Sequence, residues 1–88
     1  MTIEFYPAKT RANLRKHGVS FSHAEQALHD ANALTVEDRG AVGERRFVTL
    51  GMDALGTLLV VVHTHNADKT RVISTRKASR SELEQYHA

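Results

Sequence analysis

Basic side chains bracket a short segment near the C-terminal end of the chain, and their spacing suggests chemistry. Arg71 and Arg76 flank the β-rich run 72–75, and Lys77 follows directly. Cations that lead into a helix N-terminus are suited to holding a phosphate, because the free N–H groups there also favour anions. Strict alternation would put Arg71 and Arg76 on opposite faces of a strand, since their separation is odd. They can share one site only if the strand bends or ends near residue 75; solvated or ion-paired surface arginines are the alternative.

Two histidines and one glutamate are the candidates for proton transfer. His63 and His65 are two residues apart in a β-rich run, so their side chains point the same way. No third ligand has a convincing spacing, and we expect no metal site. His63 could transfer a proton, since the imidazole pKa lies near neutrality, or could be a partly buried structural residue. Glu44 precedes Arg45 and Arg46, and alternation sends these two arginines to opposite faces.

A polar stripe runs along the predicted first helix. Lys9, Asn13 and His17 are spaced four residues apart, and Lys16 lies beside them. One interpretation is that Asn13 and His17 satisfy backbone groups near a sheet while Lys9 stays solvated. The other is that the stripe contacts RNA or a protein partner.

Three helices are needed to position these residues, and start and stop signals mark each of them. The sequence predicts helices from Pro7 to about His17, from about His23 to Asp30, and from Ser79 to about Tyr86. Gly18 suits the left-handed conformation that often ends a helix. The spacing of Ser22 with Glu25, and of Ser79 with Glu82, is typical of capping boxes.

Four β-rich runs, 34–37, 45–50, 58–64 and 71–75, lie between the second and the last helix. Their short connections favour an antiparallel meander, and the apolar run 58–62 favours a central place for the third strand. Residues 3–6 form a further short strand or an extended arm. The expected fold is α+β: two N-terminal helices, a four-stranded antiparallel sheet and a C-terminal helix, in a single domain of residues 1–88.

Composition and charge distribution indicate the cellular compartment and the kind of ligand that the chain could bind. The chain has no cysteine, which excludes disulfides and thiolate metal sites, and its longest apolar run is far too short to cross a membrane. We expect a cytoplasmic protein. Residues 1–23 and 69–88 each carry a net charge of +3, whereas residues 24–68 carry −4. Two basic segments that converge could bind phosphate, although solvated surface charge is the alternative.

Several segments together resemble one family. They are Phe5-Tyr6-Pro7-Ala8-Lys9, Asn13-Leu14-Arg15-Lys16-His17-Gly18-Val19-Ser20-Phe21, Glu44-Arg45-Arg46-Phe47-Val48-Thr49-Leu50-Gly51, Leu59-Val60-Val61-Val62-His63-Thr64 and Arg71-Val72-Ile73-Ser74-Thr75-Arg76-Lys77-Ala78. In this order they resemble the BrnT toxins. Tyr6 is a departure, because the family usually has Asp before this proline.

The resemblance implies a RelE-like ribonuclease toxin of a type II toxin-antitoxin system, which cleaves RNA and inhibits translation without a metal or other cofactor. It further implies a DNA-binding antitoxin of the BrnA type, a hetero-oligomer with it, and promoter binding only through that antitoxin. We expect the antitoxin to cover the basic surface. The alternative is a catalytically degenerate binding module that only holds an antitoxin or regulator.

The matched motifs also imply roles for individual residues. Arg71 and Arg76 are assigned to phosphate stabilisation, Lys77 is a supporting cation, and either Glu44 or His63 is the general base. The expected RNA contacts are Lys9, Lys16, His17, Arg46 and Arg80.

Overall fold

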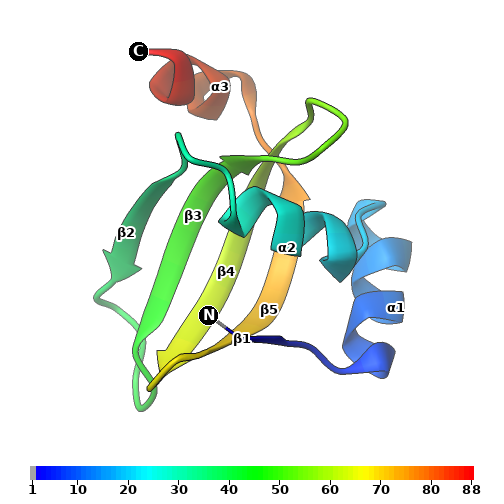
Figure 1. The fold of residues 1–88 in the computed structure, drawn as a ribbon, viewed down its shortest axis with the longest axis vertical. Helices are drawn as coiled ribbons and strands as arrows, with labels where there is room; N and C mark the ends of the chain where they lie inside the picture. Colours follow the sequence, from blue (N-terminus) through cyan, green and yellow to red (C-terminus); the bar gives the residue numbers. More distant parts are fainter. Residues whose placement is uncertain (1) are drawn as a thin grey trace.

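The computed structural model describes residues 2–88, which form one five-stranded sheet with three helices. The elements are β1 (Thr2–Glu4), α1 (Pro7–His17), α2 (Phe21–Leu28), β2 (Leu34–Asp38), β3 (Arg46–Met52), β4 (Leu58–Asn66), β5 (Lys69–Lys77) and α3 (Arg80–His87). The sheet order is β1-β5-β4-β3-β2. α2 lies across one face of the sheet, α1 stands beside β5, and α3 lies at one end (Figure 1). No helix of residues 2–88 is long and apolar enough to span a membrane.

The sheet confirms the expected meander and adds one strand to it. β2 to β5 are antiparallel neighbours in chain order. The prediction of four strands is wrong by one, because β1 pairs in parallel with β5, with Glu4 opposite Arg71. A three-residue strand gives almost no periodic signal, and its partner lies more than sixty residues away in the chain. β1 is held by that pairing and by Ile3, which packs against the core.

Of the two N-terminal helices, α1 has the ends that its sequence signals predict, and α2 begins earlier than predicted. α1 begins at Pro7 and ends at Gly18, which has φ +73° and donates its N–H to the Leu14 carbonyl, as predicted. The predicted capping box of Ser22 and Glu25 is wrong. α2 begins earlier, at Phe21, and the N-cap residue is Ser20, without a side-chain capping bond. The earlier start agrees with the burial of Phe21, which is 0% exposed. Its ring anchors the first turn of α2 to the sheet.

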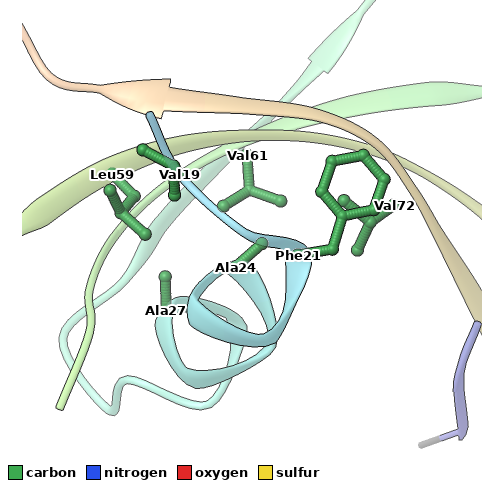
Figure 2. Packing of buried hydrophobic residues seen from close by; sticks show 7 residues of the cluster. All are labelled: Val19, Phe21, Ala24, Ala27, Leu59, Val61 and Val72. Atoms are coloured by element: carbon green, nitrogen blue, oxygen red, sulfur yellow. The ribbon is translucent and has the colours of Figure 1, made fainter. Parts of the chain in front are cut away.

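The core lies between α2 and the sheet (Figure 2). It contains Val19, Phe21, Ala24 and Ala27 from the helical side, and Leu59, Val61 and Val72 from the sheet. The helix approaches β3 so closely that a Cβ on Gly51 would lie 2.2 Å from the Ala27 carbonyl oxygen. Small side chains on α2 and a glycine on β3 therefore allow this helix to pack directly on the strands.

α1 is fixed to the edge of β5 by the side chain of Asn13. Its amide nitrogen donates to the carbonyls of Thr75 and Val19, each at 2.8 Å, and its oxygen accepts from the Thr75 N–H at 3.1 Å. Asn13 thus pairs with backbone groups of β5 beyond the point where β1 ends. The interpretation that this residue satisfies backbone groups near the sheet is confirmed.

Candidate active site on the open face of the sheet

The sheet has two chemically different faces. Directly opposed residues in antiparallel strands share a face. Leu59 and Val61 point into the core under α2, so Val60, Val62 and Thr64 point to the other side. We call this other side the open face.

A row of polar side chains crosses all five strands at one end of the open face. Thr64 in β4 is opposite Arg46 in β3 and Arg71 in β5, and the row continues to Asp38 in β2 and Glu4 in β1. The register therefore brings together arginines from strands that are distant in the chain.

Arg71 forms an ion pair with Glu44, which precedes β3. Both side chains are partly exposed, so the pair is accessible to a ligand. They line a hollow of about 190 Å³ together with Glu4, Thr64, Asn66 and Lys69. A carboxylate that can take a proton thus lies beside a guanidinium that can hold a phosphate oxygen.

Arg76 lies on the same face as Arg71, contrary to the expectation from their odd separation. The register on β4 steps from Val62 to His63 while β5 steps from Ser74 to Val72, so Ile73 is an extra residue that reverses the alternation. The two arginines still lie in different rows. Arg76 is opposite Val60 and Arg71 is opposite Thr64, a separation of roughly 13 Å along β4.

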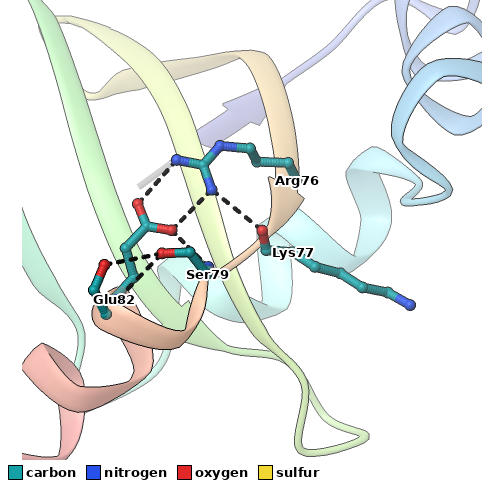
Figure 3. Close-up of polar contacts among 5 residues, drawn as sticks. Arg76, Lys77, Ser79 and Glu82 are labelled. Carbon is teal, nitrogen blue, oxygen red and sulfur yellow. Dashed lines mark hydrogen bonds and ion pairs between the residues drawn. The ribbon is translucent and has the colours of Figure 1, made fainter.

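Arg76 binds α3 in this structure. Its guanidinium donates to both carboxylate oxygens of Glu82, at 2.8 and 2.9 Å, as Figure 3 shows. Glu82 also closes the capping box with Ser79, which confirms that sequence prediction. The bond from Arg76 lowers the pKa of Glu82 to about 2. The arginine therefore positions the last helix, at a distance from the Glu44 and Arg71 pair.

Lys77 and His63 lie on the opposite face, the side of the sheet on which α2 packs; Lys77 is exposed there and His63 is buried. Lys77 is opposite Leu59 and extends away from Arg76 (Figure 3). His63 is 2% exposed and its Nε2 lies 2.7 Å from the Thr49 hydroxyl. Burial lowers the pKa of His63 to about 4, which leaves it neutral at pH 7. Of the two candidate bases, only Glu44 is next to Arg71.

The remaining predicted contacts lie around the edge of the open face. Lys9, Lys16 and His17 line a hollow of about 270 Å³ between α1 and β5, where Ile73 and Ser74 form its other wall. Arg80 is exposed at the first turn of α3. The predicted set is therefore divided: Glu44, Arg46 and Arg71 are together, and the others are at the edge, at the α3 end or behind the sheet.

Comparison with known proteins identifies the family. Residues 5–82 match the family described as the ribonuclease toxin BrnT of type II toxin-antitoxin systems. The chain belongs to the BrnT family. Its fold is similar to the crystal structure of the Brucella abortus ribonuclease toxin BrnT, with a TM-score of 0.69 and 25% sequence identity, over 91% of this chain and 99% of that one. No curated protein matches the chain.

Sequence reasoning missed four polar residues that line the hollow in this BrnT-family chain: Glu4, Thr64, Asn66 and Lys69. Alternation could have found Lys69, which is two residues before Arg71 and so shares its face. Glu4 could not be found this way, because its position depends on the pairing of β1 with β5. As a member of a toxin-antitoxin family, the chain is a toxin whose partner is an antitoxin.

Proposed function

We propose that this toxin is a metal-independent endoribonuclease whose active site is the hollow around Glu44 and Arg71. The observation that carries the proposal is the ion pair of these two residues in a row with Arg46. Cleavage of RNA by its own 2′-hydroxyl needs a base, a cation for the charge on phosphorus and an acid for the leaving oxygen. The hollow holds one residue for each task.

In the proposed reaction, Glu44 takes the proton of the ribose 2′-hydroxyl as its oxygen attacks the adjacent phosphorus. Arg71, in β5, holds the phosphate oxygens with two parallel N–H groups. Arg46 adds positive charge from β3, on the other side of β4. The bond from phosphorus to the 5′ oxygen breaks, and that oxygen takes a proton from Lys69, the second cation of the hollow. The products are a 2′,3′-cyclic phosphate and a free 5′-hydroxyl.

The RNA strand would continue from this hollow along the α1 side of β5. Lys9 and Lys16 have no acidic partner among residues 2–88, and with His17 they offer a positive groove for the neighbouring phosphates. Arg80 and Arg76 lie at the α3 end, where a longer strand would reach them. Lys77 and His63 have no part in this path, because they lie on the other face of the sheet.

In the cell, RNA cleavage would stop translation until the antitoxin binds. We propose that the antitoxin is of the BrnA type, that it forms a hetero-oligomer with this chain in the cytoplasm, and that it supplies the promoter-binding domain. α2 buries its apolar side on the sheet and α1 supports the edge of β5, which supports a division in which DNA recognition belongs to the partner.

The proposal is tested by incubating the purified chain with a single-stranded RNA in excess EDTA. Cleavage should continue in the chelator and leave 2′,3′-cyclic phosphate ends, identified by mass spectrometry. A degenerate binding module is the second candidate, because Glu44 neutralises Arg71 when no substrate is bound. Antitoxin binding without any cleavage would favour that candidate and overturn the enzyme proposal.

A further inference from the structure

Apolar side chains cover the part of the open face next to the polar row. Cross-strand pairing aligns Val36, Val48 and Val62 in one row. The following row aligns Leu34, Leu50 and Val60. We call these two rows the apolar floor. At its outer end the floor is exposed, with Val36 66% and Leu34 46% accessible. Large apolar side chains this exposed in adjacent rows are typical of a surface that another molecule covers.

The exposed end of the floor is also an open strand edge. β2 is the last strand of the sheet and pairs with β3 only. Within residues 2–88 no further strand pairs with its outer side, and every residue of β2 except Asp38 is exposed. Such an edge presents N–H and C=O groups that an extended polypeptide can pair with.

Positive charge lies at one end of the floor. Arg46 is next to the valine row, whereas Arg76, in line with the leucine row, is already paired with Glu82. A ligand that covers the floor therefore meets the guanidinium of Arg46 at this end, which favours an acidic side chain there.

The chemistry of the floor favours a polypeptide over RNA bases. Unpaired bases bind proteins by stacking on aromatic rings or arginine planes. The floor is built from valine and leucine, and the neighbouring ring of Phe47 lies on the helix face with His63. Aliphatic rows beside a free strand edge instead match alternating apolar residues of a second chain.

We propose that the apolar floor and the β2 edge are the docking surface for the antitoxin. A segment of the antitoxin with alternating apolar residues pairs with β2, packs on the floor, and places acidic side chains on Arg46 and Arg71. The Glu44 and Arg71 hollow is then covered from the side of β2. This inference rests on the proposed function only in taking that hollow as the site to be blocked.

The test compares Val36→Asp and Val36→Lys with Val42→Asp. Val42 is 98% exposed in the loop before β3, outside the floor, so it is a matched control. Affinity of each variant for the cognate antitoxin is measured by titration, and cleavage of RNA by the free variants is measured alongside. Both Val36 variants should bind the antitoxin roughly tenfold or more weakly, while Val42→Asp binds as the parent does. All three should cleave RNA at the parent rate and keep the parent circular dichroism spectrum.

Two opposite charges at position 36 separate apolar contact from electrostatics. If only one Val36 variant loses affinity, charge decides and the docking proposal is overturned; it is also overturned if both bind like Val42→Asp. Hydrogen exchange of the complex should protect the amides of residues 34–38, and no protection there would count against it equally. If the parent fails to cleave RNA but these binding results hold, the proposed function fails and the docking surface stands.

Discussion

Arg71 is the residue whose replacement tests the chemistry most directly. Arg71→Ala should lower the rate of RNA cleavage by about 10²–10³, because a preorganised charged donor is lost from the phosphate site. Arg71→Lys should restore little activity, since lysine keeps the charge but not the planar pair of N–H groups. The half-exposed side chain lies outside the core, so both variants should keep the parent melting temperature within a few degrees. Cleavage assays with calorimetry of the same samples check these outcomes.

Arg45 offers a matched control for that substitution. It is also an arginine in an ion pair, with Glu37 at 3.1 Å, but it lies over the Phe47 ring on the helix face. Arg45→Ala should therefore cleave RNA at the parent rate. Full cleavage by Arg71→Ala, or an equal loss in Arg45→Ala, would remove Arg71 from the mechanism.

At the residue scale, the sequence predicted which side chains matter better than where they point. Arg71 and Glu44 were both candidates, and the structure brings them together. The facing of Arg76 was mispredicted because the bulge adds Ile73, and isoleucine is so common in strands that it gives no sign of an extra residue. His63 remained a candidate base because sequence periodicity does not say which face of a sheet the helices cover.

At the element scale, the first turn of α1 lacks a side-chain N-cap. Tyr6 is the N-cap residue, with φ −91° and ψ +135°, and its side chain makes no capping bond. Tyr6→Asp should raise the free energy of unfolding by about 0.5–2 kcal/mol, because a carboxylate accepts from the free N–H groups and favours the positive end of the helix. Denaturant titration measures this gain. Tyr6→Ala is the control for the loss of the ring, which is already 56% exposed; a Tyr6→Asp protein no more stable than Tyr6→Ala would rule out the capping argument.

α3 depends on polar contacts, because none of its residues is buried. Glu82 accepts from Arg76 and from the Ser79 N–H, and the Tyr86 hydroxyl donates to Asp30. Glu82→Gln can keep the capping box but loses the ion pair, whereas Glu82→Ala loses both. Amide exchange in α3 should therefore be fastest in Glu82→Ala and intermediate in Glu82→Gln.

The control for α3 is Glu84→Gln, an exposed position on the same helix, which should exchange like the parent. Acid should have the same effect as Glu82→Gln. The pKa of Glu82 is lowered from its ordinary value of 4.5 to about 2. Its contribution to the stability of α3 is therefore fully present above pH 4.5 and is lost as the pH falls toward 2. Equal exchange in the Gln and Ala variants would show that the capping box contributes nothing.

Local signals predicted elements well where no long-range contact competed with them. The same serine-glutamate spacing predicted the start of α3 correctly and that of α2 wrongly. The difference is that α3 has no core residue on its first turn, while α2 has Phe21, whose burial outweighs one capping bond. A short strand or extended arm was expected at residues 3–6, but its place in the sheet was not predicted, because β1 pairs with a strand at the far end of the chain.

At the scale of the whole molecule, the sheet separates stability from function. The helix face holds the aliphatic core and the buried His63, and the open face holds the polar row and the apolar floor. The fold class followed from the order of elements and from family resemblance. The division between faces did not, because it depends on which side of the sheet α2 covers. Substitutions on the open face should therefore change activity or binding more than folding.

His63 makes the stability of the whole domain depend on pH. Its Nε2 lies beside the Thr49 hydroxyl, which in turn lies 2.7 Å from the Thr35 hydroxyl, and its Nδ1 has no partner among residues 2–88. Burial, with a smaller effect of His65, lowers its pKa from 6.5 to about 4. As the pH falls from 7 to 4.5, the unfolded chain binds a proton that the folded chain excludes, so the free energy of unfolding should fall by about 2 kcal/mol. Urea titrations at pH 7, 5.5 and 4.5 measure this slope. His63→Gln should flatten it even if it lowers stability at pH 7, and the exposed His29→Gln should leave it unchanged; a slope that persists in His63→Gln would show that another group is responsible.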